Sequence, residues 1–332
     1  VYEIDRPLVS SIVRGIAAVF PDYVLYAAND ADMVLVASAS GSVPPLSDAV
    51  FGWPGTRAEL EYLGIGTPEQ LRLFRIATRR GIAALLETGR ASTDYFPYLE
   101  FGAARARFFD KGDAALIRMA RDPVPLFEIL SGFDAPSLPE ASVVLAKAYP
   151  RFIDVRRANL FVTGLVAGNA AQLPGAAGLN AEDASHLALV RDIPTQRSVA
   201  AWQVWFGSLF AISRSMVPNG GGPALEAFLR SAQVGAALRD APPDIREKVE
   251  FLLLVARRDL DRVRAEGARL LAGPLQTDDP AFHAYVFVAT SGACFATNPP
   301  DASCRAVIAQ LDQVRRESPV IDLLRAQQAA LR

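Results

Sequence analysis

Cysteine and histidine are scarce in this sequence of 332 residues, which contains two of each. Two cysteines are too few for a disulfide scaffold, and neither residue type shows the spacing of a zinc site, so no metal site is expected. His186 and His283 are interpreted as core or boundary residues. Cys294 and Cys304 are interpreted as buried thiols in a reducing compartment, although a bond stays open if their helices face each other.

Long apolar runs and charge of one sign are also absent. Arg, Asp or Glu interrupts every apolar run before it reaches the roughly 18 to 20 residues that span a bilayer, so we expect no membrane insertion by this segment. The 34 basic and 36 acidic residues are mixed along the chain, and the net charge is -2. No positive field gathers phosphate groups, so nucleic acid is not an expected partner. No Gly-x-Ser-x-Gly motif of a serine hydrolase occurs.

The composition is that of a globular protein, because 51% of the residues are hydrophobic and the length suggests about two domains. Apolar residues at helical spacing between Pro7 and Pro21 predict a helix at 8–20. Two runs rich in β-branched and aromatic residues, 23–27 and 33–37, predict adjacent strands at the edge of a sheet. The Asn and Asp residues between them favour a turn.

Helical patterns dominate the rest of the chain. A stretch rich in Gly, Pro and Ser at 38–55 precedes two predicted helices at 56–63 and 67–87, and Thr67 and Pro68 are typical of a helix start. Further helices are predicted at residues 114–119, 126–130, 140–148, 156–166, 181–190, 198–217, 223–238, 245–257, 259–271, 281–297, 303–317 and 320–331. Short turns between neighbours favour antiparallel pairs, and a tetratricopeptide-like array stays open because no strict period is found.

Residues 92–101, which we call the acidic aromatic segment, read Ser-Thr-Asp-Tyr-Phe-Pro-Tyr-Leu-Glu-Phe. Carboxylates pair with ammonium groups and aromatic faces attract cations. Asp94, Tyr95, Tyr98 and Glu100 are therefore candidate residues for binding a polyamine. The competing and simpler interpretation is that a core is closed by Phe96, Tyr98, Leu99 and Phe101 while the two acids cap turns.

The order of these segments carries a resemblance to a known family. Tyr2 and Glu3 lead into the helix that ends at Pro21, and the strands 23–26 and 32–38 follow. In this order residues 1–110 resemble the downstream end of spermidine-synthase-like proteins, especially the long bacterial forms in which such a domain is fused to other regions.

The acidic aromatic segment carries the second part of the resemblance. It is similar to the pattern Asn-Thr-Asp-Asp-x-Pro-x-Leu-Glu-Phe/Tyr that closes domains of this family. Ser92 stands where the pattern has Asn, and Tyr95 stands where it has a second Asp, so one carboxylate is missing. The resemblance implies an α/β remnant of a methyltransferase-type (Rossmann-like) sheet at 1–110, followed by a mostly α-helical domain at 111–332 that could be a helical repeat.

The resemblance also implies an activity, which is transfer of an aminopropyl or methyl group from an S-adenosylmethionine-type donor to an amine. In this family the glycine-rich turn, the acid that holds the ribose and the carboxylate that accepts the proton precede the helix 8–20. None of the three is found here, and the chain begins at Val1 without Met. We therefore expect the C-terminal portion of a longer protein, inactive as given and with no cofactor site of its own. Tyr2 and Glu3 match positions near the substrate channel, which makes them candidate substrate-binding residues.

Two other features were considered as sites. Gly220, Gly221 and Gly222 lie between two predicted helices rather than after a strand, so they are interpreted as a loop. Trp202 and Trp205 begin an apolar stripe whose members are spaced by three to four residues. Such a stripe is most often core, but if its aromatic edge is exposed it becomes a candidate surface for a protein partner, because Trp is enriched at binding hot spots.

Two functions remain open from the sequence. The first is the C-terminal part of a spermidine-synthase-like enzyme that acts on a polyamine-type molecule. The second is a non-catalytic scaffold or protein-binding module with a degenerate synthase-like domain and a helical-repeat surface. In both cases cysteine usage favours a cytoplasmic location, including the cytoplasmic part of a membrane-anchored parent.

Overall fold

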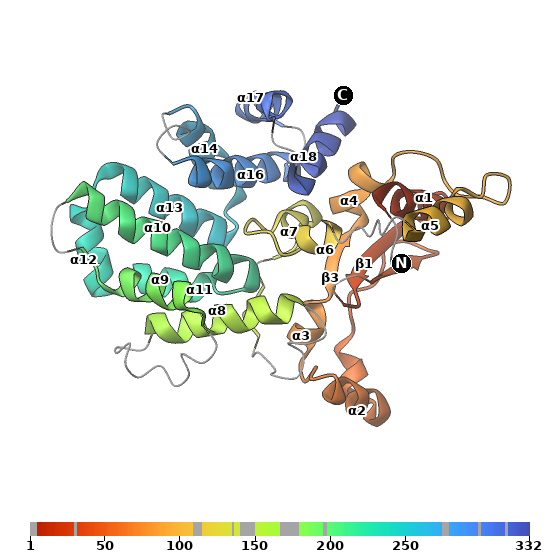
Figure 1. Cartoon of the computed structure of the whole chain (residues 1–332), viewed down its shortest axis with the longest axis horizontal. Coiled ribbons are helices and arrows are strands. Elements are labelled where there is room, and N and C mark those ends of the chain that lie inside the picture. Colours follow the sequence, from red (N-terminus) through yellow and green to blue (C-terminus); the bar gives the residue numbers. More distant parts are fainter. Residues whose placement is uncertain are drawn as a thin grey trace. The chain divides into compact units, whose positions relative to one another are not determined.

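The computed structural model describes residues 5–29, 32–108, 115–134, 136–139, 150–166, 179–194, 198–273, 279–297, 300–315 and 318–332 (Figure 1). The chain divides into two compact units. The first unit comprises Val1–Phe133, Ser142–Arg151 and Cys294–Arg332, and the second comprises Asp134–Ala141 and Phe152–Ala293. Most described residues are helical, and their only sheet is small.

The sheet of the first unit has three antiparallel strands in the order β2-β1-β3. β1 (Asp22–Ala27) pairs with β2 (Met33–Ser38), as the sequence predicted for adjacent strands. The Asn29 side-chain amide donates to Asp32 Oδ2 at 2.7 Å, and Asn29 Oδ1 accepts from the Asp32 amide, which closes the turn between them. β1 is nevertheless the central strand, because β3 (Arg75–Thr78) lies on its other side.

β3 corrects the prediction of one helix over 67–87. Thr67 and Gln70 form a capping box that starts α3 (Pro68–Arg72), as the residue types favour. The chain then enters the sheet, where Ile76 and Ala77 are buried, and only afterwards forms α4 (Arg79–Leu86). Long-range pairing with β1 therefore overrides local helical spacing, because the ladder satisfies the backbone while it buries these side chains.

Helices cover this sheet within the first unit. α1 (Arg6–Ala17) begins at Asp5, whose carboxylate accepts from the Leu8 amide at 3.2 Å. α4 packs against α1, α7 (Leu126–Ser131) and α18 (Pro319–Ala330). The remaining elements of this unit are η1 (Asp48–Gly52), α2 (Pro54–Tyr62), α5 (Tyr98–Phe108), α6 (Ala115–Met119), α17 (Ala302–Ala309) and η6 (Gln310–Gln313).

The start of β1 is fixed by a polar cluster. Tyr23 donates its hydroxyl to Glu87 at 3.2 Å, and Arg79 binds both oxygens of the same carboxylate at 2.7 and 2.9 Å. Burial, together with the negative charge of Glu87, raises the pKa of Tyr23 far above its ordinary value. Tyr23 is therefore a buried, neutral residue that ties the start of β1 to Glu87.

The second unit is a bundle of helices. Its complete elements are α9 (Ala181–Arg191), α10 (Val199–Met216), η5 (Val217–Asn219), α11 (Gly222–Leu229), α12 (Ala232–Asp240), α13 (Pro243–Arg257) and α14 (Leu260–Leu271). It also contains α8 (Pro150–Val166) except for its first two residues, and most of α16 (Pro280–Ala296). α9 packs on α10, and α13 packs on α10, α11 and α14. The α-helices among them range from 8 residues in α11 to 18 in α10.

The core of the second unit is aromatic. Phe282 meets Phe206 and Phe210 edge to face, with ring centroids 5.1 and 5.3 Å apart. Trp202 and Trp205 are 2% and 1% exposed, and the Trp205 indole donates to the Val190 carbonyl at 2.9 Å. The apolar stripe of α10 is therefore core, which corrects the interpretation of Trp202 and Trp205 as a partner-binding surface.

The two units also differ from the expected division near residue 110. The C-terminal residues 294–332 belong with the first unit because α18 packs on α4 and α6. No helix among the described residues is long and apolar enough to cross a membrane.

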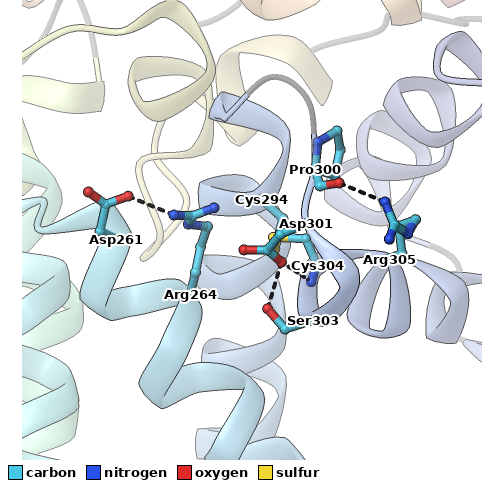
Figure 2. The surroundings of a disulfide bond; sticks show 8 residues. All are labelled: Asp261, Arg264, Cys294, Pro300, Asp301, Ser303, Cys304 and Arg305. Atoms are coloured by element: carbon cyan, nitrogen blue, oxygen red, sulfur yellow. Dashed lines mark hydrogen bonds and ion pairs between the residues drawn. A yellow bond between two sulfur atoms is a disulfide. The ribbon is translucent and has the colours of Figure 1, made fainter.

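Cys294 and Cys304 are bonded to each other, and their Cα atoms are 5.3 Å apart (Figure 2). The interpretation of two free buried thiols is therefore wrong. Helix periodicity could not show this, because the pairing depends on how α17 folds back beside the end of α16.

Candidate functional site

The acidic aromatic segment begins with a tight turn in the first unit. The Thr93 amide donates to the Phe96 carbonyl at 3.0 Å, and the Phe96 amide donates to the Thr93 carbonyl at 2.9 Å. Asp94 and Tyr95 occupy the two central positions of this turn. The Thr93 hydroxyl also accepts from the Phe96 amide at 3.1 Å, so the tip is fixed by three hydrogen bonds.

Ser92 fixes the start of α5, which carries Tyr98 and Glu100. Its Oγ accepts from the Leu99 amide at 3.0 Å and donates to Glu100 Oε2 at 3.4 Å. Satisfying a free amide in the first turn is the usual role of a capping side chain, and Asn performs it as well as Ser. Ser92 therefore caps the first turn of α5.

The segment is anchored on α1. The Ser92 amide donates to the Ser11 carbonyl at 3.3 Å. α5 packs closely on α1 at Gly102, where an added Cβ would lie 2.3 Å from Leu8 Cδ2. Because α1 in turn packs on α4, the turn and the first turn of α5 are held on the helical layer of the first unit.

The aromatic side chains of the segment are exposed. The exposed fractions are 92% for Tyr95, 66% for Phe96, 49% for Tyr98 and 77% for Phe101. The interpretation that the segment closes a core is therefore wrong for Phe96, Tyr98 and Phe101. Single exposed apolar residues are ordinary, but four exposed rings on one short segment are not.

The segment carries negative charge. Asp94 and Glu100 are exposed, and in the described part of the chain neither carboxylate forms an ion pair. Carboxylates beside exposed tyrosine rings offer both partners that an ammonium group recognises, which are a charged acceptor and a π face. Asp94, Tyr95, Tyr98 and Glu100 are thus all exposed on this one segment, whereas Tyr2 and Glu3 lie outside the described residues.

The three consecutive glycines do not form a ligand cradle. A Cβ at Gly220 would lie 2.5 Å from the Leu138 amide nitrogen, one at Gly221 would lie 2.8 Å from Met216 Cβ, and one at Gly222 would lie 3.0 Å from the Ala256 carbonyl. Protein atoms therefore occupy the space that a phosphate or nucleoside needs. Gly220 also has a φ of 92°, which favours glycine in the turn between η5 and α11.

A serine, a histidine and a glutamate meet in the second unit, which sequence reasoning missed. His186 Nδ1 lies 3.2 Å from Ser208 Oγ, and His186 Nε2 lies 3.7 Å from Glu182. Ser208 is 3% exposed in the middle of α10, where the backbone amides are used inside the helix and cannot stabilise an oxyanion. The group is therefore a packing contact, and only the spacing of four between Glu182 and His186 was visible in the sequence.

No group of three metal-binding side chains occurs among the residues that the structure describes. Burial lowers the pKa of His283, which favours its neutral form.

No family model, curated protein or solved structure matches this chain.

Proposed function

We propose that this chain is the C-terminal portion of a spermidine-synthase-like protein that transfers an aminopropyl or methyl group from an S-adenosylmethionine-type donor to an amine. In this proposal the acidic aromatic segment contacts the amine, and the chain alone is inactive. The supporting observation is the exposure of Asp94, Tyr95, Tyr98 and Glu100 on one anchored segment.

The described residues do not fit the donor itself. Among the described strands none leads into a glycine-rich turn, since β3 passes directly into α4. The only run of glycines is filled by neighbouring protein atoms, as shown above. Donor binding and proton transfer are therefore assigned to the parent protein outside this chain, and no reaction step is assigned to residues described here.

An amine titration of the chain tests the part of the proposal that belongs to it. We expect spermidine and putrescine to shift the NMR signals of residues 92–101, and an uncharged diol of similar length to leave them unchanged. Binding should weaken as salt rises, because exposed charges are screened. If spermidine shifts no signal of this segment, its assignment to the amine is wrong.

Variants separate charge from aromatic contact. Replacing both acids (Asp94→Asn with Glu100→Gln) should weaken spermidine binding by about tenfold or more, and Tyr95→Ala with Tyr98→Ala should weaken it less. Glu59→Gln on α2 is a matched control, because Glu59 is also exposed. An equal loss of affinity in the control would show only non-specific attraction to a negative surface.

Titration of the parent protein tests the enzymatic part. The parent should bind both the S-adenosylmethionine-type donor and the amine, whereas this chain should bind the amine alone. Binding of neither molecule by the parent would rule out the transferase.

The exposed phenylalanines favour a second function. Phe96 and Phe101 add apolar surface that a small amine does not need, and such patches are typical of protein-binding sites. A non-catalytic protein-binding module would therefore use this segment rather than the buried α10 stripe. Under this alternative, Phe96→Ser with Phe101→Ser abolishes partner binding and leaves spermidine binding unchanged.

A further inference from the structure

We infer that Cys294 and Cys304 form a permanent structural disulfide, and that this part of the chain therefore folds and works in an oxidising compartment. The inference does not depend on the proposed function. It replaces the cytoplasmic location that cysteine usage alone favoured.

The two residues are positioned by neighbouring helices. Cys294 lies in the last turn of α16, and Cys304 lies in the first turn of α17, ten residues later. Their Cα separation of 5.3 Å is in the ordinary range for bonded cysteines. They are the only two cysteines of this chain, so no other pairing is possible within it.

The first turn of α17 is built in a way that fixes Cys304 (Figure 2). Asp301 Oδ1 accepts from the Cys304 amide at 2.8 Å and from the Ser303 hydroxyl at 2.7 Å. Arg305 donates to the Pro300 carbonyl at 3.1 Å, which holds the chain just before the cap. The capped turn therefore presents the Cys304 side chain to Cys294 in a fixed direction.

Burial makes the bond permanent rather than switchable. Cys294 is 1% exposed and Cys304 is fully buried. Reduction requires a thiolate to reach one of the two sulfur atoms, so a buried disulfide is protected as long as its surroundings stay folded. Redox-sensing cysteines, by contrast, are solvent-accessible.

Formation of the bond needs a compartment that supplies an oxidant. The two thiols lose two protons and two electrons as the S–S bond forms, and these reduce the S–S bond of a protein or glutathione disulfide to two thiols. Such exchange runs toward protein disulfides in oxidising compartments, whereas the cytosol keeps thiols reduced. A buried bond between the two cysteines of this chain is therefore typical of proteins that fold outside the reducing cytosol.

The bond also has a structural task. α17 has only 8 residues, and an isolated helix of this length is not stable in water. The Gln328 side chain donates to the Ile308 carbonyl at 3.2 Å, and Arg332 pairs with Asp312 at 3.1 Å, so α17, η6 and α18 form one corner. The disulfide ties that corner to the end of α16, while α18 packs on α4.

The acidic aromatic segment belongs to the same unit as the disulfide. If the segment binds an amine as proposed, it meets that amine in the oxidising compartment. Amine binding in that compartment rests on the proposed function, whereas the disulfide does not, so failure of amine binding leaves the inference about the compartment intact.

The redox state in cells tests the inference directly. Cells that make the full-length protein are quenched with acid, free thiols are alkylated, and the peptides containing Cys294 and Cys304 are analysed by mass spectrometry. We expect the linked pair of peptides and almost no alkylated cysteine. Alkylation of both residues would overturn the inference, and a mixture that changes with the redox state of the cells would overturn the permanence of the bond.

A thermal measurement tests the structural task. Cys294→Ser with Cys304→Ser should lower the melting temperature of the full-length protein by about 5 °C. If that variant does not fold, reduction of the folded wild-type protein gives the same comparison, and glutathione should act on it only when denaturant is added. Rapid reduction by glutathione without denaturant, or an unchanged melting temperature after reduction, would contradict a buried structural bond.

Discussion

Two aromatic regions of this protein differ in burial. Trp202, Trp205 and Phe206 on α10 are almost fully buried, whereas Tyr95 and Phe101 of the acidic aromatic segment are mostly exposed. The α10 rings recur along one face of an 18-residue helix and pack against other helices. The segment places its rings on a turn and on the short helix α5, next to Asp94 and Glu100, which have no ion-pair partner in the described chain. Aromatic content alone therefore does not distinguish core from surface.

The largest effect is expected from Trp205→Ala. The substitution removes a buried indole and leaves the Val190 carbonyl without its donor, so the free energy of unfolding should fall by about 3 to 5 kcal/mol. Urea denaturation, monitored by the circular dichroism signal of the helices, measures this change. A loss below about 1 kcal/mol would show that the indole is not part of the core.

Phe282→Leu sharpens the comparison inside the aromatic core. The substitution keeps an apolar side chain but removes the edge-to-face contacts with Phe206 and Phe210, so we expect a loss of about 1 to 2 kcal/mol. The same urea experiment applies, with Phe101→Leu as the exposed control. Equal effects at the two positions would contradict the contrast between the regions.

Ser92→Ala tests whether the exposed segment is ordered. Loss of the hydrogen bond from the Leu99 amide should destabilise the start of α5 by about 1 kcal/mol. Hydrogen exchange of the first-turn amides of α5 should become faster, while exchange in α10 stays unchanged. Ser92→Asn is the matched control and should restore protection.

Glu226 provides a carboxylate that differs from the unpaired acids of the segment. Hydrogen bonds from Arg257, at 2.8 and 2.6 Å, lower its pKa below the ordinary value of 4.5. The contribution of this pair to the free energy of unfolding is therefore fully present above pH about 4.5. It is lost as the pH falls through the lower pKa that Glu226 has in the folded state.

The same pair predicts the behaviour of a variant. Glu226→Gln should lower the free energy of unfolding by less than about 1 kcal/mol at neutral pH, because the side chain is 30% exposed. The variant should also lose less stability than the wild type as the pH falls below about 4.5. Thermal melts between pH 3 and pH 7 measure both effects.

Tyr95→Ala should have the smallest effect on folding. Its side chain is 92% exposed, so the free energy of unfolding should change by less than about 0.5 kcal/mol. The same substitution is expected to weaken spermidine binding when combined with Tyr98→Ala. A large loss of stability would mean that Tyr95 is buried in solution.

Much of the fold follows from local sequence signals. The helix at 8–20, the paired strands near 23–27 and 33–37, and the helix start at Thr67 were predicted from residues close to one another in the chain, and the structure shows all three. The acidic aromatic segment was also visible, because its residue types are unusual. Its exposure was not visible, since exposure depends on what the rest of the chain places over it.

The sequence by itself determined the helix and turn signals, the mixed charge and the residue types of the candidate site. Only the tertiary structure decided that residues 75–78 form a strand, that the α10 tryptophans are core, and that Cys294 bonds to Cys304. The physical reason is the range of the interactions. Caps and turns are set by atoms a few residues apart, whereas strand pairing, burial and disulfide geometry depend on segments that meet only after the chain has folded.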